Sequence, residues 1–331
     1  MKHTFFTLAL LALIICPLFA QTASLGQETN KQQEQLSRFP TELEVSLSPR
    51  DIVYAVKDTT VLKMDIYRPE AQQSKLPCLV FLYGGGFSSG SKDKKSTVEF
   101  CHQMTERGYV VVAINYRHGM AGVKDKGCKR ISSLERAIGM AVEDLYSATD
   151  YLLTNASAIG IDPSIIMISG SSAGAVTVLQ ADYELSNKFE RAGLLPGDFS
   201  YAGVIAFAGG VFSREGRPDY ERQPAPTLFF HGKEDRMVKY KSTRFFNIGF
   251  FGSHALTKRF KKFGFPYVTY RFEDMGHEMA VLPMQHHLTE INNFINSCVL
   301  EGNHCRIDST FVDHGLPRAD YGSWNLNRLY Q

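Results

Sequence analysis

Two hydrophobic patterns divide the predicted strands of this chain into two kinds. Apolar and polar side chains alternate over residues 61–67, which is typical of a strand with one buried face in an antiparallel pair. Residues 52–56 are its predicted hairpin partner. The later runs are apolar without alternation, which predicts strands buried on both faces of a parallel sheet. These runs are 78–82, 109–114, 165–169, 203–207, 227–230 and 267–272.

Helical periodicity fills the intervals between these runs. Apolar residues recur at i, i+3, i+4 and i+7 over residues 134–152, which predicts a long amphipathic helix. Further helices are expected near 96–107, 175–185, 242–262 and 283–297. The order predicts a doubly wound α/β fold with a mostly parallel, eight-stranded sheet, helices on both faces and an antiparallel N-terminal edge.

Both ends of the chain differ from this regular pattern. Residues 1–20 combine a short basic start with an apolar run that ends near Ala20, as in a cleaved secretory signal. We therefore expect an exported, periplasmic or secreted protein; a lipoprotein signal at Cys16 is the weaker alternative. A polar arm is expected over 21–49, an α/β domain over 50–299, and a C-terminal tail over 300–331 that packs on the domain without regular structure.

Composition excludes several function classes. The formal net charge of +2 gives no electrostatic reason to expect a nucleic-acid or anionic-membrane partner. Apart from the start of the chain, no segment is long and apolar enough to span a bilayer. Neither a C-x-x-C nor an H-E-x-x-H spacing occurs, so no metal or other cofactor is predicted. Cys298 and Cys305 are close enough in sequence to form a disulfide that joins the last helix to the tail.

The stretch Gly-Ser-Ser-Ala-Gly at residues 170–174 is the most informative motif. It follows an apolar strand and opens a helical segment, so it has the context of a nucleophile elbow with Ser172 at the turn. Gly170 and Gly174 would let the strand and helix backbones approach closely. The N–H group of Ala173 is expected to stabilise an oxyanion. The alternatives are a plain Gly/Ser connection or a phosphate-binding loop, but no lysine follows the turn as a P-loop requires.

A second motif, Tyr-Gly-Gly-Gly-Phe at residues 83–87, directly follows the strand 78–82. Three successive glycines leave backbone N–H groups uncovered, as an oxyanion hole requires. The alternative is a flexible turn. The pairing of this loop with the elbow favours the oxyanion hole.

An acid and a base follow two later strands. Asp235 comes after the strand 227–230 and can orient a catalytic histidine, although Glu234 competes with it and a turn residue is the alternative. His277 comes after the strand 267–272, at the position of a general base. The chain order Ser172, Asp235, His277 is the order of the α/β-hydrolases. His231 is expected to shape the acid's loop. The remaining histidines near the C-terminus, His286, His287, His304 and His314, are expected on the surface.

With these motifs, the sequence resembles the α/β-hydrolase superfamily of serine esterases over about residues 53–298. The resemblance is to short bacterial carboxylesterases and the hormone-sensitive-lipase-like group, supported by Asp-Ile-Tyr-Arg-Pro at 65–69 and Ala-Ile-Asn-Tyr-Arg at 113–117. That group usually has histidine before the three glycines. Here Tyr83 takes this position, and the motif Tyr-Gly-Gly-Gly-Phe instead resembles that of the type-B carboxylesterases. The resemblance implies that Gly85 and Gly86 donate to the oxyanion together with Ala173. It also implies that an insertion near 245–256 shapes the pocket.

These observations predict a serine carboxylesterase that works through an acyl-enzyme and needs no cofactor. Its expected substrates are small-molecule esters or small acyl groups on carbohydrates. A serine peptidase or lipase of the same fold is the alternative, and a noncatalytic binding module is a third. The sequence does not define acyl length, the alcohol partner or the oligomeric state.

Overall fold

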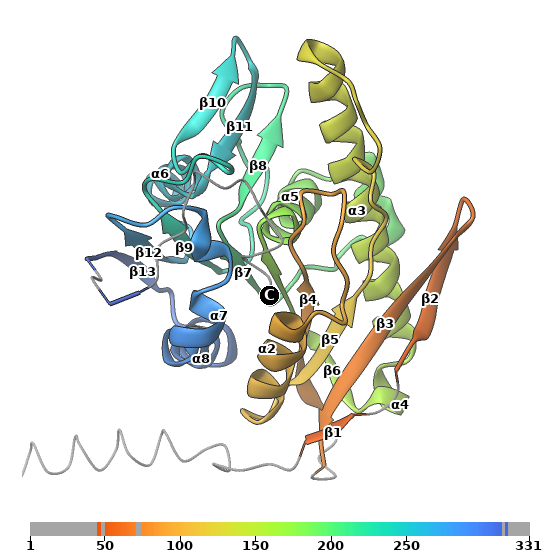
Figure 1. The fold of residues 1–331 in the computed structure, drawn as a ribbon. Coiled ribbons are helices and arrows are strands. Elements are labelled where there is room, and N and C mark those ends of the chain that lie inside the picture. The colour runs from red at the N-terminus through yellow and green to blue at the C-terminus, as the bar shows by residue number, and fades with distance from the viewer. Residues whose placement is uncertain (1–44, 48–49, 71–74, 313–314, 317–331) are drawn as a thin grey trace, which may run out of the picture. The chain divides into compact units, whose positions relative to one another are not determined.

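The computed structural model describes residues 45–47, 50–70, 75–312 and 315–316 (Figure 1). The predicted signal segment 1–20 and most of the predicted arm 21–49 lie outside the described residues, as does most of the tail beyond 312. The described residues all belong to one compact unit. Within them, no helix is long and apolar enough to cross a membrane.

A ten-stranded sheet forms the centre of the fold (Figure 1). Its order is β1-β3-β5-β4-β6-β7-β9-β12-β13, and β2 pairs with β3. All pairings from β5 to β13 are parallel, whereas β1, β2 and β5 pair antiparallel with β3. The strands are β1 (Val45–Leu47), β2 (Ile52–Lys57), β3 (Thr60–Pro69), β4 (Leu76–Leu82), β5 (Val110–Ile114), β6 (Ile161–Ser171), β7 (Gly203–Phe207), β9 (Thr227–Gly232), β12 (Tyr267–Phe272) and β13 (Arg306–Phe311).

The predicted fold class is therefore confirmed, with β1 and β13 added to the eight expected strands. Every residue of β5 and of β7 is buried. Because successive side chains of a strand point to opposite faces, both faces of the sheet are covered at these strands. This burial explains why their sequences are apolar without alternation.

The helices pack on this sheet. They are α2 (Lys95–Thr105), α3 (Gly127–Thr154), α4 (Ala156–Ile159), α5 (Ala173–Ser186), α6 (Ser253–Phe263), α7 (Pro283–His286) and α8 (Leu288–Phe294). Two 3-10 turns, η1 (Glu190–Leu194) and η2 (His277–Ala280), and a π-helical turn, η3 (Ile295–Leu300), complete the set. Helix α5 packs on β6 and β7 and against α3, while α2 packs on β3 and β5. The single helix expected over 283–297 is divided into α7, α8 and η3.

The helix expected over 242–262 is wrong in its first half. Strands β10 (Ser242–Phe245) and β11 (Ile248–Gly252) form a hairpin that pairs with β8 (Gly210–Ser213) in a separate three-stranded sheet, and α6 begins only afterwards. Aromatic and β-branched residues favour a strand here, and two glycines disfavour a helix. Gly252 is also required by close packing, since a Cβ there would lie 2.0 Å from the carbonyl oxygen of Lys239.

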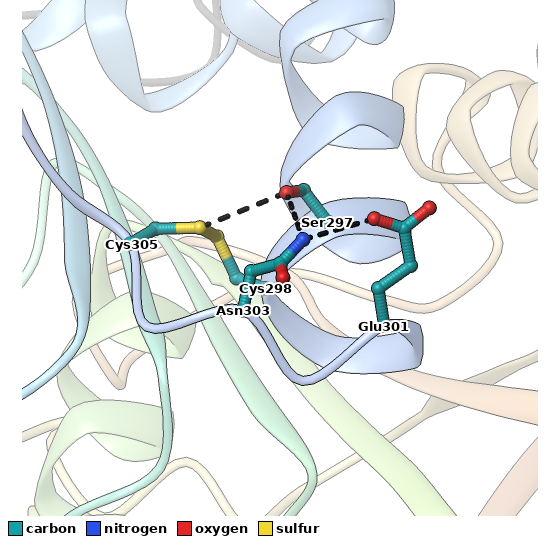
Figure 2. The surroundings of a disulfide bond; sticks show 5 residues. All are labelled: Ser297, Cys298, Glu301, Asn303 and Cys305. Atoms are coloured by element: carbon teal, nitrogen blue, oxygen red, sulfur yellow. Dashed lines mark hydrogen bonds between the residues drawn. A yellow bond between two sulfur atoms is a disulfide. The ribbon is translucent and has the colours of Figure 1, made fainter. Parts of the chain in front are cut away.

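The expectation of a tail without regular structure is wrong for β13, which extends the sheet in parallel beside β12. A disulfide between Cys298 in η3 and Cys305 holds the chain immediately before this strand (Figure 2). The two Cα atoms are 5.9 Å apart, and this is a pairing that the sequence allowed. Inside the eight-residue loop, the Asn303 side chain donates to Ser297 and Glu301, which adds two polar contacts to the covalent link (Figure 2).

Removing this disulfide should destabilise the C-terminal edge of the sheet. We expect the double variant Cys298→Ala, Cys305→Ala to lose about 2 kcal/mol in free energy of unfolding, because a short loop is no longer closed in the unfolded chain. Urea unfolding under oxidising conditions measures this loss. Cys128→Ala, which removes an exposed free thiol, is the matched control. Equal stability of the double variant and the control would contradict the prediction.

Candidate active site

Ser172 occupies the sharp turn between β6 and α5. Its backbone has φ 51° and ψ −113°, a combination that L-residues with side chains rarely adopt. Such a conformation costs on the order of 1–3 kcal/mol and is held only when the surroundings over-determine it. Here the Ser172 N–H donates to the carbonyl of Phe207 on β7, and the Ser172 carbonyl accepts from Val176 on α5.

Glycines make this turn sterically possible. A Cβ on Gly174 would lie 2.1 Å from the carbonyl oxygen of Leu82, at the end of β4. A Cβ on Gly170 would lie 2.3 Å from the carbonyl carbon of Gly174. The start of α5 therefore lies in backbone contact with two strand ends, as predicted for the elbow.

The structure brings the three predicted catalytic side chains together. The Ser172 hydroxyl lies 2.8 Å from Nε2 of His277, and Nδ1 of His277 lies 2.8 Å from Oδ2 of Asp235. Each side chain follows a different strand: Ser172 follows β6, Asp235 lies after β9, and His277 begins η2 after β12. All three are buried. The arrangement has the geometry of a nucleophile, a general base and an orienting acid.

Asp235 is held from several sides. Its Oδ1 accepts from the N–H groups of Met237 and Val238 at 2.8 and 2.9 Å. Its Oδ2 lies 3.3 Å from Nε2 of His231, which also contacts the carbonyl of Val238. Burial acts to raise the pKa of Asp235, but the charges and hydrogen bonds of His277 and His231 outweigh burial and hold that pKa well below its ordinary value. The carboxylate is therefore ionised beside the imidazole.

The competing residues take other positions. Glu234 is exposed, whereas Asp235 is buried. His231 shapes the acid's loop, as expected, and its Nδ1 contacts the hydroxyl of Ser253. His286 and His304 are exposed, and His314 lies outside the described residues. The expectation for His287 is wrong, because this side chain is buried against the rings of Phe230, Phe272 and Phe311.

The glycine loop after β4 turns back sharply beside Ser172. Gly85 has φ 148° and Gly86 has φ 62°, and the Gly85 carbonyl accepts from the N–H groups of Ser88 and Ser89. In the described part of the chain, the N–H groups of Gly85 and Gly86 donate to no backbone carbonyl. Ala173 opens α5, where the first N–H groups of a helix have no partner within the helix. These free donors agree with the predicted oxyanion hole, whose residue roles stay a prediction.

Tyr83 connects the glycine loop to the segment after β5. Its ring stacks on Tyr116 with centroids 4.7 Å apart, and its hydroxyl lies 3.0 Å from Nε2 of His118. The Tyr116 hydroxyl in turn donates to the Tyr83 carbonyl. Tyr83 thus stands where the hormone-sensitive-lipase-like group usually has histidine. Its stacking and hydrogen bonds hold the start of the glycine loop against the segment after β5.

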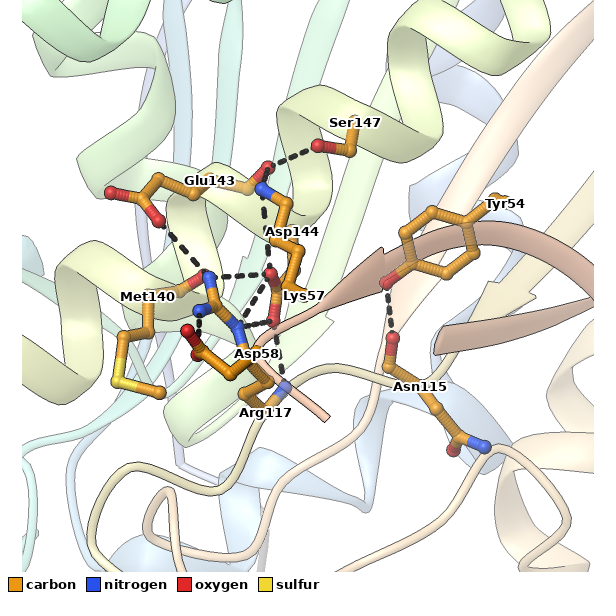
Figure 3. Close-up of polar contacts among 9 residues, drawn as sticks. All are labelled: Tyr54, Lys57, Asp58, Asn115, Arg117, Met140, Glu143, Asp144 and Ser147. Atoms are coloured by element: carbon orange, nitrogen blue, oxygen red, sulfur yellow. Dashed lines mark hydrogen bonds and ion pairs between the residues drawn. The ribbon is translucent and has the colours of Figure 1, made fainter. Parts of the chain in front are cut away.

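An ion-pair network holds the segment after β5 (Figure 3). Arg117 lies at its centre: the guanidinium group pairs with Asp144 and Glu143 on α3 and with Asp58 in the β2–β3 turn. Burial raises the pKa of Asp144 although Arg117 acts to lower it. This network was not predicted from the sequence. The Asn-Tyr-Arg segment at 115–117 was the only feature of the sequence that pointed to it.

A buried ion pair fixes the far end of the glycine loop. Nζ of Lys92 lies 2.9 Å from Oδ2 of Asp65 on β3, and both side chains are almost fully buried. The Lys92 N–H donates to the side chain of Asn115. The loop is therefore anchored at both ends to the same segment after β5, which keeps its donors in place relative to Ser172.

A cavity of about 650 Å³ opens at Ser172. Gly86 and Ala173 line it beside Ser172, whereas Gly85 does not. The predicted insertion 245–256 contributes Phe245, Ile248, Gly249 and Phe250 to its wall. In the residues that the structure describes, no group of His, Cys, Asp or Glu side chains is placed to hold a metal ion.

Comparison with known proteins agrees with this geometry. The family model BD-FAE matches residues 64–200. Gut esterase 1 of Caenorhabditis briggsae is 31% identical over 119 residues, which cover 36% of this chain and 20% of that protein. Carboxylesterase NlhH of Mycobacterium tuberculosis is 26% identical over 153 residues, which cover 46% of this chain and 43% of that protein. The matched segments thus span less than half of these relatives.

A solved structure extends the similarity over most of the fold. Esterase 2 of Thermogutta terrifontis, phosphoramylated by tabun, superposes with a TM-score of 0.55 at 22% identity. The match covers 82% of this chain and 98% of that chain. Together with the sheet order and the elbow, this match shows an α/β-hydrolase fold, and in sequence the chain is similar to esterases and carboxylesterases.

Proposed function

We propose that this chain is a serine carboxylesterase. The observation that carries the proposal is the continuous hydrogen-bonded chain from Ser172 through His277 to Asp235, which opens on a cavity beside free backbone donors. The sequence similarity to carboxylesterases supports the same activity.

In the proposed reaction each group has a distinct role. His277 accepts the Ser172 proton at Nε2 while the serine oxygen attacks the ester carbonyl. The N–H groups of Gly85, Gly86 and Ala173 stabilise the oxyanion, and His277 then protonates the leaving alcohol. Water hydrolyses the acyl-enzyme by the same sequence of proton transfers. Asp235 keeps Nδ1 of His277 protonated, so that Nε2 is free to accept.

We also propose that the protein is exported and that its esters include small acyl groups on carbohydrates. The Cys298–Cys305 disulfide supports export, since disulfides persist in oxidising compartments. A panel of esters that varies the acyl and alcohol parts separately tests the substrate class, and a peptide-amide arm tests peptidase activity.

The first prediction concerns the nucleophile. We expect Ser172→Ala to lower kcat on p-nitrophenyl butyrate by about a millionfold, because the acyl-enzyme can no longer form. Labelling by a fluorophosphonate probe should be lost as well. Ser169→Ala is the matched control: its buried hydroxyl has no hydrogen-bond partner in the described structure, so its loss should leave activity intact. Hydrolysis by Ser172→Ala at the wild-type rate would refute the proposal.

The second prediction concerns the acid. Asp235→Asn should lower kcat by about ten-thousandfold, because the amide favours the wrong tautomer of His277. Glu234→Gln, which changes the exposed neighbour, should retain activity. A large loss in Glu234→Gln together with an active Asp235→Asn would transfer the role to Glu234.

Comparison of the wild type with Asp235→Asn also gives a prediction about the pH dependence of stability. The pKa of Asp235 is lower in the folded protein than its unfolded value of about 3.9. Its ionised form therefore stabilises the fold at all pH values above the unfolded pKa, and this contribution is lost as pH falls through the folded pKa. Urea unfolding between about pH 2 and 7 should show wild type losing more stability in acid than Asp235→Asn. Parallel curves would contradict the low folded pKa.

The third prediction separates two glycines of the oxyanion loop. A Cβ on Gly85 would lie 1.9 Å from the carbonyl oxygen of Ser89, whereas a Cβ on Gly86 meets nothing closer than 3.9 Å. Gly85→Ala should therefore displace the loop and lower kcat by about a hundredfold or more, the usual loss for an oxyanion donor. Gly86→Ala should cost less than about tenfold, since only its backbone conformation is strained. Equal kcat values in the two variants would contradict this geometry.

A further inference from the structure

The cavity at Ser172 combines an apolar interior with positively charged side chains. Its apolar lining comes from the oxyanion loop, α5, β8 and the β10–β11 hairpin. Four cations also line it: Arg214, Arg236, Lys239 and Arg244. None of the lining residues is an aspartate or a glutamate. The cavity wall is thus asymmetric in charge, although the chain as a whole is nearly neutral.

Two of these cations are available to a ligand. Arg214 is paired with Glu135 on α3, so its charge is largely compensated. Lys239 and Arg244 are exposed, and in the part of the chain that the structure describes neither pairs with a carboxylate. Lys239 follows the loop of the triad acid, and Arg244 lies on β10. The two charges therefore come from separate elements that meet at one cavity.

The β10–β11 hairpin, which carries Arg244, forms part of the cavity wall. Phe245 and Phe246 at its end are 75% and 82% exposed, and their rings lie against each other. Phe246 has φ 51°, a strained conformation for an aromatic residue at a turn. Phe245 lines the cavity beside Arg244. An apolar wall and a free cation thus lie next to each other at the cavity mouth.

From this arrangement we infer that the preferred substrates are anionic esters, in which an apolar part occupies the cavity and a carboxylate or similar negative group binds at Lys239 and Arg244. This inference rests on the proposed esterase function and specifies its substrate class. Opposite charge at the mouth raises the local concentration of such an ester and holds it during attack.

Matched ester pairs test this inference. On the acyl side, p-nitrophenyl butyrate is compared with mono-p-nitrophenyl glutarate, which adds a terminal carboxylate. On the alcohol side, phenyl butyrate is compared with 4-carboxyphenyl butyrate. The measured quantity is the ratio of kcat/KM for the anionic ester to that for the neutral ester, at ionic strengths of about 0.01 M and 0.5 M.

We expect the double variant Lys239→Gln, Arg244→Gln to lower this ratio by about three- to tenfold in at least one arm, as exposed ion pairs contribute modestly. High salt should reduce the wild-type ratio in the same arm, since it screens exposed charges. Lys241→Gln is the matched control, because Lys241 is exposed on the same segment but does not line the cavity. It should keep the wild-type ratio.

The outcomes separate this inference from the esterase proposal. A lowered ratio in one arm supports the inference and identifies the part of the ester that carries the charge. If wild type and both variants give the same ratio in both arms while they hydrolyse the neutral esters, the inference is overturned and the esterase function stands. If wild type hydrolyses no ester in either arm, the esterase function itself fails.

Discussion

The backbone contact between α5 and the end of β4 is the constraint on which this site depends. With no side chain at Gly174, the helix lies against the Leu82 and Tyr83 carbonyls, where even a methyl group would overlap. This contact places the nucleophile turn and the oxyanion loop side by side, although they are almost ninety residues apart in sequence. The strained backbone of Ser172 is then held by hydrogen bonds to Phe207 on β7 and Val176 on α5.

The other catalytic groups are buried polar atoms, which are costly unless each has a partner. Asp235 accepts hydrogen bonds from two backbone N–H groups and contacts two histidines. Its negative charge is therefore compensated within the fold. The oxyanion loop is supported in the same way by Tyr83 and by the Lys92–Asp65 pair. In the proposed reaction little reorganisation is needed, because these polar groups already satisfy one another.

The sequence predicted the parts of this structure that depend on local chemistry. Apolar runs mark the parallel strands, and a reactive residue directly after a strand must lie at the same edge of the sheet as its counterparts. Ser172, Asp235 and His277 are of this kind. Strands β11 and β13 were missed because each pairs with a strand that is distant in sequence, β8 or β12, and tertiary pairing decides whether such segments form strands. The Arg117 network was missed for the same reason, since its carboxylates come from α3 and from the β2–β3 turn, both distant in sequence from Arg117.

The proposed catalytic side chains and much of the cavity wall come from different parts of the fold. The reacting groups lie at strand ends, where elements of the central sheet fix them within hydrogen-bond distance of one another. Much of the cavity wall instead comes from β8, the β10–β11 hairpin and the start of α3, which lie outside that sheet. Changes in the hairpin can alter charge and shape at the cavity mouth without moving Ser172, because no catalytic hydrogen bond passes through it. In the proposed esterase, the chemistry and the selection of the ester are therefore carried by separable parts of the chain.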